Sequence, residues 1–479
     1  MEMEPAQGRP VTGTSLISTA PAGREWQFAV MAGAILSVIF VMVMQFAAGA
    51  PNVLALFPLI AVVLVLAGSF ELCLAAIVIS LYVDVHFLYF SSAVVLSAVL
   101  AVSFVLTRRD IAWRRFANPM TVPILVYGLC IVPSFLNAAR PDKSLIALWN
   151  VAAFLIVLYT VIAGLGTRGE IRKIAALYLA LTCANGLLVI VLSVLGEKRP
   201  FGVPGMMYVD YAGLGVCVTV AMSAVSRGRS RRLLMLPALV IAIALILTET
   251  RSIWIASGIT LAVLAGYLIV HPDLTGLPRR WVITAAATAA LGIAALGTIV
   301  VSLNPRIEER AAQLTGGGAD QIDQAGLAIN SLISRAFIWD TARNAFLAHP
   351  YVGIGVYAFP YSSQHYSTLP KLLFNLYVKG NSPHQTHFAV LSETGLVGMA
   401  GYLVFLVAAV RCAFQSVRRA PGMRGRRFGF VAAIGLTYCF VSMGFTDAWL
   451  WGQGIVLLGL VMGLMLVNRR IGAAECSPA

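Results

Sequence analysis

Long apolar runs, joined by short polar or basic links, make up most of the chain. Each run is as long, or nearly as long, as the roughly 20 residues that a helix needs to cross the hydrocarbon core of a bilayer. The pattern predicts about 14 transmembrane helices. They are expected at 26–48, 52–68, 71–88, 91–106, 119–137, 144–165, 174–195, 208–226, 233–250, 252–270, 281–303, 388–410, 428–446 and 452–467. We therefore expect an all-α polytopic integral membrane protein.

Composition supports the membrane assignment and leaves little material for a soluble domain. Of the 479 residues, 59% are hydrophobic and only 11% are charged, and the mean hydropathy is +0.86. The cysteines lie in or beside apolar spans, apart from Cys476 near the C-terminus, and the long polar link has none. No disulfide framework is expected.

Basic residues fall in alternate links, which orients the predicted bundle. Loops on the cytoplasmic side carry the excess of Lys and Arg. The basic links contain Arg108, Arg109, Arg114 and Arg115; Arg168, Arg172 and Lys173; Arg227, Arg229, Arg231 and Arg232; Arg279 and Arg280; Arg411, Arg418, Arg419, Arg424, Arg426 and Arg427; and Arg469 and Arg470. Both tails, 1–25 and 471–479, are then cytoplasmic. Orientation and contact with anionic lipids account for the net charge of +14, so no nucleic-acid partner is expected.

One link is far longer than the rest. Residues 304–383 separate a transmembrane bundle at 26–303 from C-terminal transmembrane helices at 384–470, and the alternation places this loop in the periplasm. Long ordered loops usually carry function. Ser331 or Ser334 can cap a helix within the loop whose apolar side includes Trp339.

The end of the long loop predicts a helix start that carries a histidine. Ser382 suits the N-cap, Pro383 the first helical position, and Gln385 completes a capping box. The positive end of the helix disfavours a protonated imidazole, so His384 should stay neutral and could act as a general base. A histidine at the membrane interface that is bonded to backbone is the structural alternative.

Two arginines stand out as possible anion ligands. Arg251 lies between two spans on the side where the orientation rule disfavours Arg, and Arg335 lies near the start of the expected loop helix. A guanidinium group can grip phosphate oxygens in a bidentate manner. The alternatives are that Arg251 snorkels to the interface beside Glu249, and that Arg335 pairs with Asp340 or Glu309.

Several other residues have both a structural and a functional interpretation. Gly353 and Gly355 suit a turn better than a phosphate cradle. Glu393 is costly near an apolar span and should have a polar partner. The link before Asp210 contains Lys198 and Arg199, which could add positive field on the same side.

The histidines also raise the possibility of a metal site. His384 and His387 are three residues apart, and His349 and His365 lie elsewhere in the loop. The spacing lacks the Glu of the His-Glu-x-x-His signature, and no cluster of carboxylates accompanies it. We expect no metal.

The order of the conspicuous motifs resembles the bacterial O-antigen ligase and polymerase superfamily over about residues 245–400. The matching motifs are Thr250-Arg251-Ser252 with Trp254; Ser334-Arg335 with Trp339; His349-Pro350 with Gly353 and Gly355; and His384-Gln385 with Glu393, Gly395-Leu396 and Gly398. One departure is visible, because the family usually has Asn after the motif histidine, where this chain has Gln385.

The resemblance implies a C-type glycosyltransferase-like enzyme of the bacterial inner membrane. It would move a glycan from undecaprenyl diphosphate to an acceptor hydroxyl on the periplasmic side, without metal or cofactor. His384 would be the catalytic base, and Arg251 and Arg335 would bind the diphosphate. Trp339, Gln385, His387 and Glu393 are expected to support the site.

The acceptor distinguishes two activities within this superfamily. A ligase would use a lipid A core sugar, which we favour, and a polymerase of O-antigen or exopolysaccharide would use the next lipid-linked repeat unit. A transporter or flippase for lipid-linked sugars is the alternative from another class. It would place charges near the bilayer midplane in repeated halves, whereas here they lie at one interface.

Overall fold

The computed structural model describes residues 66–284, 287 and 322–476, with gaps at 67, 83–85, 88–89, 108–115, 117, 198, 204, 277, 285–286, 421 and 448–451. The chain divides into Met1–Val65 and Leu66–Ala479, and the structural description concerns the second unit. The expected tail at 1–25, the span at 26–48, and most of the spans at 52–68 and 281–303 lie outside the described residues.

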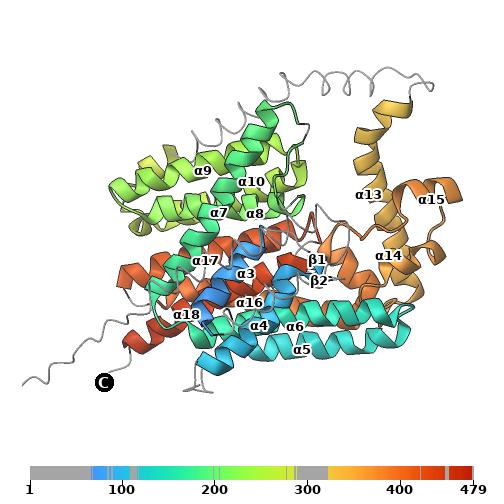
Figure 1. Ribbon diagram of the computed structural model, residues 1–479, viewed down its shortest axis with the longest axis horizontal. Helices are drawn as coiled ribbons and strands as arrows, with labels where there is room; N and C mark the ends of the chain where they lie inside the picture. The colour runs from blue at the N-terminus through green and yellow to red at the C-terminus, as the bar shows by residue number, and fades with distance from the viewer. Residues whose placement is uncertain are drawn as a thin grey trace, which may run out of the picture. The chain divides into compact units, whose positions relative to one another are not determined.

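The described residues form helices almost throughout (Figure 1). In chain order these are α3 (Phe70–Ser80), α4 (Ser92–Thr107), α5 (Thr121–Ile131), η3 (Val132–Asn137), α6 (Pro141–Gly164), α7 (Arg168–Val194), α8 (Met207–Val225), α9 (Arg229–Leu247), α10 (Arg251–Val270), η4 (Pro272–Leu274), α13 (Ile322–Ala348), α14 (Phe359–Ser362), η5 (Ser363–His365), α15 (Lys371–Tyr377), α16 (Thr386–Arg418), α17 (Gly422–Ser442) and α18 (Gly452–Cys476). The exception is a small antiparallel pair of strands, β1 (His86–Phe87) and β2 (Phe90–Ser91).

Seven of the described helices are long and apolar enough to cross a membrane, and three shorter helical segments are also apolar. This confirms a helical, multi-pass membrane protein. The count of about 14 spans and the periplasmic placement of the long loop stay predictions.

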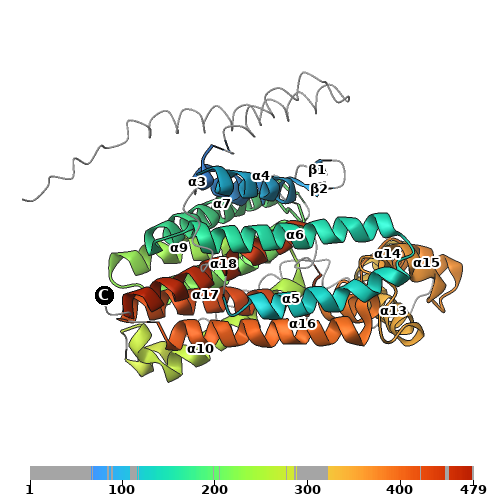
Figure 2. The ribbon, with the colours of Figure 1, turned by 90° about the horizontal axis from the view of Figure 1, so that it is seen from below.

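Small residues bring the long helices together. A Cβ atom on Gly459 of α18 would lie 2.9 Å from the Phe154 carbonyl oxygen of α6, and one on Gly463 would lie 2.8 Å from the Val161 side chain. Glycines at such contacts let helix backbones approach closely, which is how membrane helices gain packing contacts. Figure 2 shows α16 running alongside α5, and these two helices also pack together closely.

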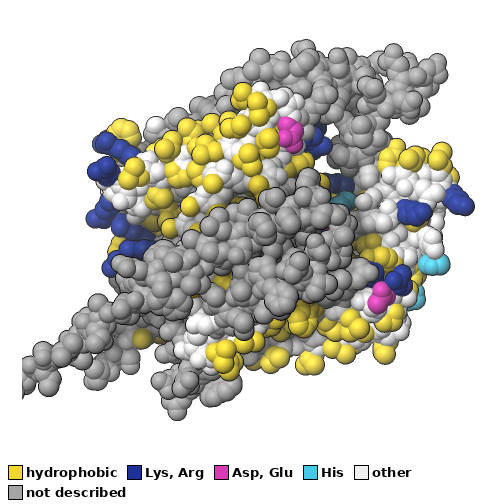
Figure 3. All heavy atoms as spheres, viewed as in Figure 1, with side chains coloured by type: hydrophobic (Ala, Val, Ile, Leu, Met, Phe, Trp, Pro, Cys, Tyr) yellow, Lys and Arg dark blue, Asp and Glu magenta, His cyan; other side chains and the backbone are white. Residues whose placement is uncertain are grey.

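The basic ends of several helices lie together, as the alternation predicts. Arg168, at the start of α7, forms an ion pair of 2.6 Å with Glu475 near the end of α18. Arg426, near the start of α17, pairs at 2.8 Å with Asp273, which follows α10. In Figure 3, Lys and Arg side chains gather at the left end, with hydrophobic side chains over the upper helices beside them. Helix ends on the expected cytoplasmic side therefore meet in space.

Candidate active site

Three hydrogen bonds hold the segment that carries His384. The indole Nε1 of Trp339, in α13, donates to the Pro383 carbonyl oxygen at 3.0 Å. The Thr386 amide donates to the Met443 carbonyl at 3.0 Å, and its hydroxyl donates to the Thr446 carbonyl at 2.8 Å. The histidine segment is thus fixed between α13 and the turn that follows α17.

The backbone of His384 has an unusual conformation, and the expected helix start is wrong. His384 has φ +53°, a left-handed conformation that non-glycine residues rarely adopt and that often occurs at functional sites. Helix α16 begins at Thr386, with Gln385 as an N-cap residue that makes no side-chain cap bond. Ser382 does not cap the helix, and its hydroxyl lies 3.5 Å from His384 Nδ1. The capping box fails because bonds to the turn after α17 set where the helix starts.

Helix α13 presents Arg335 and Trp339 toward the histidine segment. The two residues are four apart, so they share one face of the helix, and the Trp339 ring stacks on Phe388 at a centroid distance of 5.6 Å. The expected caps Ser331 and Ser334 are wrong, because α13 begins earlier, at Ile322. The Ser334 hydroxyl instead donates to the Tyr377 carbonyl at 3.1 Å.

Asp447 is a site residue that the sequence reasoning missed. It directly follows Thr446, and its charge acts on both His384 and Arg335. Its Oδ2 atom is buried and has no hydrogen-bond partner among the described residues. A lone carboxylate in the apolar, aromatic stretch around 443–451 was the available signal, because such a charge is costly at the edge of a membrane span.

The surroundings of His384 favour a neutral imidazole. Burial lowers the pKa of His384, the Asp447 charge raises it, and the Arg335 charge lowers it, so that the pKa lies below its ordinary value. A histidine with a lowered pKa is unprotonated at neutral pH and can accept a proton. The main reason for a neutral His384 is therefore burial, whereas the sequence had suggested the positive end of a helix.

Arg251 lies at the start of a long helix. It is the first residue of α10 and is exposed. Ile253, two residues further along α10, and Tyr438 of α17 both lie beside Gly213 of α8. Arg251 therefore lies near the end of α17 that leads to Asp447. None of the contacts among the described residues joins Arg251 to Arg335 or His384.

Comparison with known families bears on this set of residues. Residues 236–403 match the family model described as O-antigen ligase. The matched segment is similar to that family and covers about a third of the chain. It contains Arg251, Arg335 and His384, whereas Asp447 lies beyond its end. No curated protein matches the chain. The expected resemblance to the O-antigen ligase and polymerase superfamily is confirmed over these residues.

Within the O-antigen ligase segment, Glu393 has the polar partners that its burial requires. Its carboxylate accepts the backbone amides of Tyr357 at 2.9 Å and Phe359 at 3.3 Å. Phe359 begins the short helix α14, so the buried carboxylate satisfies amides that a helix start leaves unpaired. Glu393 thereby ties the loop to α16 and supports the site from outside it.

The two glycines of the loop motif dock against a break in α16. Gly395 has φ +63° and ψ −162°, which interrupts the helix. The freed carbonyl of Glu393 accepts the Gly355 amide at 3.0 Å, and the freed Leu396 amide donates to the Pro350 carbonyl at 2.8 Å. A side chain on Gly353 would overlap the Glu393 backbone. The structure thus gives the Gly353 and Gly355 motif a packing role.

The other histidines of the O-antigen ligase segment pack against tyrosines. The His387 ring lies 5.7 Å from that of Tyr402, and His349 and His365 both flank Tyr366. In the described part of the chain, no group of three or more His, Cys, Asp and Glu side chains is arranged to bind a metal. Gln385 has a buried Oε1 atom that lacks a hydrogen-bond partner among described residues.

Proposed function

We propose that this protein is a periplasm-facing transferase of the bacterial inner membrane that moves a glycan from undecaprenyl diphosphate to an acceptor hydroxyl. The O-antigen ligase match supports the reaction class. The observation that carries the assignment is a half-buried His384, held in a left-handed backbone conformation, on which the charges of Arg335 and Asp447 act. A general base beside a cationic phosphate ligand is what such a transfer requires.

In the proposed reaction, the acceptor hydroxyl oxygen forms a bond to the anomeric carbon of the donor glycan. The bond from that carbon to the diphosphate oxygen breaks, and its electron pair leaves with the lipid diphosphate. His384 takes the proton of the hydroxyl. Attack from the face opposite the leaving group inverts the anomeric centre.

The two cationic side chains have a matching role in this proposal. Arg335 neutralises the negative charge that grows on the leaving diphosphate. Arg251, exposed at the start of α10, is proposed as the second diphosphate ligand. Asp447 stabilises the imidazolium that forms when His384 accepts the proton, because it carries the opposite charge.

We favour a ligase that uses the lipid A core as acceptor. A polymerase would need the same donor site, so the two activities differ in the acceptor. Glycans from a deletion strain separate them. Accumulated lipid-linked polymer indicates a lost ligase, whereas lipid A core that carries a single repeat unit indicates a lost polymerase.

The transfer itself is tested with purified protein in detergent, given lipid-linked glycan and acceptor. Turnover without a membrane barrier supports an enzyme, and no turnover favours a transporter. His384→Ala should lower the rate on the order of 10²- to 10⁴-fold, the usual contribution of a general base. His365→Ala changes an exposed histidine of the same loop and should leave the rate unchanged. Near-normal turnover by the His384 variant would overturn the base assignment.

A further inference from the structure

A polar pocket lies toward the opposite end of α16 from His384. The cavity has a volume of about 420 Å³ and is lined by Pro119, Ala408, Arg411, Cys412, Gln415, Arg419 and Arg469. The pocket residues of α16 begin at Ala408, 13 residues beyond the break at Gly395, or about 20 Å further along the helix at 1.5 Å per residue. The pocket is therefore separate from the candidate active site.

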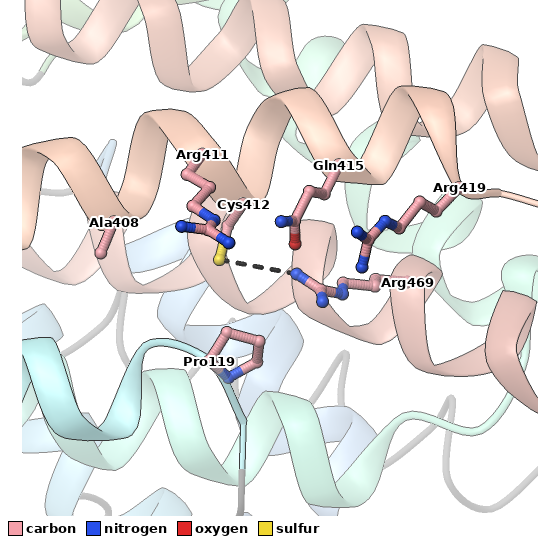
Figure 4. A pocket seen from close by; sticks show the side chains of 7 residues that line it. All are labelled: Pro119, Ala408, Arg411, Cys412, Gln415, Arg419 and Arg469. Atoms are coloured by element: carbon pink, nitrogen blue, oxygen red, sulfur yellow. Dashed lines mark hydrogen bonds between the residues drawn. The ribbon is translucent and has the colours of Figure 1, made fainter.

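Three elements build this pocket (Figure 4). Arg411, Gln415 and Arg419 are four residues apart and project from one face of α16. Arg469 reaches in from α18, and its Nη1 atom lies 3.7 Å from the Cys412 sulfur. Pro119, just before α5, closes the remaining side. Membrane orientation and general contact with anionic lipids explain arginines at this end of the helices, but neither requires that they meet around a cavity.

The pocket arginines differ from their neighbours in lacking oxygen acceptors. Arg168 and Arg426 form ion pairs with carboxylates, and Arg470 donates to the carbonyls of Ile162 and Leu165. Among the described residues, Arg411, Arg419 and Arg469 bond to no carboxylate or carbonyl oxygen, and no carboxylate lines the cavity. Three guanidinium groups gathered around a space favour a bound anion, because the anion offsets their mutual repulsion.

The surface beside the pocket is apolar and exposed. On α16, Val404 is 46% exposed and Val407 is 67% exposed, and both lie on the side of the helix that ends at Arg411. On α5, Val122 and Leu125 are 68% and 59% exposed. In a membrane these rows contact acyl chains. The anion in the pocket can therefore be the charged headgroup of a lipid.

We infer that this pocket binds a phosphate group, supplied by the headgroup of an anionic lipid in the leaflet that the arginine distribution marks as cytoplasmic. The acyl chains of that lipid lie along the exposed rows of α5 and α16. The site does not depend on the proposed transfer reaction, and its failure would leave that proposal intact.

The test is lipid retention by the purified full-length chain, measured by native mass spectrometry with phosphatidylglycerol, zwitterionic phosphatidylethanolamine and inorganic phosphate as probes. The triple variant Arg411→Gln, Arg419→Gln and Arg469→Gln should bind phosphatidylglycerol roughly 10- to 100-fold more weakly. The matched control changes Arg229, Arg232 and Arg424 to Gln, which removes the same charge from exposed positions outside the pocket. Its affinity should change less than about threefold.

A variant that changes no charge distinguishes binding in the pocket from general electrostatic attraction of anionic lipids to basic residues. Ala408→Phe fills the cavity and leaves every arginine in place, and it should also weaken phosphatidylglycerol binding. Competition by inorganic phosphate would show that the phosphate group suffices, and its failure to compete would identify the lipid as the source. The inference is overturned if the control triple variant loses as much binding as the pocket variant, or if phosphatidylethanolamine binds equally well.

Discussion

The indole of Trp339 holds the carbonyl of Pro383, one residue before His384, through a hydrogen bond of 3.0 Å. The two residues are 44 positions apart in the chain. Arg335 lies one helical turn before Trp339 on α13, so a single helix both positions the histidine and supplies the nearby cation. A positioning residue of this kind acts on catalysis through the geometry of another residue.

Trp339→Phe tests that relationship, because it keeps a ring to stack on Phe388 but removes the donor. Loss of one hydrogen bond should lower stability by about 1 kcal/mol. The displaced histidine should lower the transfer rate by roughly 10- to 100-fold. Turnover and thermal unfolding in detergent measure the two effects. Trp281→Phe, at an exposed tryptophan, should leave both unchanged, and equal effects of the two variants would contradict a positioning role.

The pH dependence of transfer tests the charges around His384. The base must be unprotonated, so kcat/KM should fall as the pH drops through a pKa below the ordinary histidine value of about 6.5. Asp447→Asn removes a negative charge that raises this pKa, so the acid limb should move to lower pH. Arg335→Gln removes a positive charge that lowers it, so the acid limb should move to higher pH.

These opposite shifts can be read from the residual activity of each variant. The position of the limb is independent of its height, so loss of diphosphate binding by the Arg335 variant does not obscure the result. Shifts in the same direction, or no shift in either variant, would show that His384 is not the titrating base.

Gly395→Ala should destabilise the protein strongly. The residue has φ +63°, and a Cβ atom there would overlap the backbone of Tyr351. Backbone strain together with the lost docking of the loop should cost roughly 3 kcal/mol, seen as a lower unfolding temperature. Gly258→Ala is the control, because this glycine lies in α10 with open space around its Cα. Similar unfolding temperatures for both variants would rule out the docking role of the helix break.

Glu393→Gln should loosen the loop without removing its side chain. The amide keeps one acceptor oxygen, but its NH₂ group meets a backbone amide that also donates. Two donors that face each other without an acceptor should lower the free energy of unfolding by about 1–3 kcal/mol. Proteases should then cut the 350–370 loop faster. Exposed Glu197→Gln serves for comparison. Unchanged proteolysis of the Glu393 variant would count against the tether.

The chain alone was sufficient to predict the helical membrane architecture and to name three candidate site residues. The apolar runs set the spans because bilayer thickness imposes their length, and arginine placement orders their ends because the membrane is asymmetric. Arg251, Arg335 and His384 could be named because the membrane-orientation rule leaves Arg251 unexplained, and because motif order adds a chemical context for all three. Their roles stay predictions.

Only the tertiary structure decided how the site is assembled. Helix α16 starts at Thr386, where the sequence predicted Pro383, because bonds to Met443 and Thr446 outweighed a local cap. Asp447 entered the site, and Glu393 found its amide partners, through contacts across tens of residues. Hydropathy and local propensity report the surroundings of each segment. They carry no information on which distant carbonyl, amide or charge will contact a given segment. Such contacts set the conformation and protonation of His384.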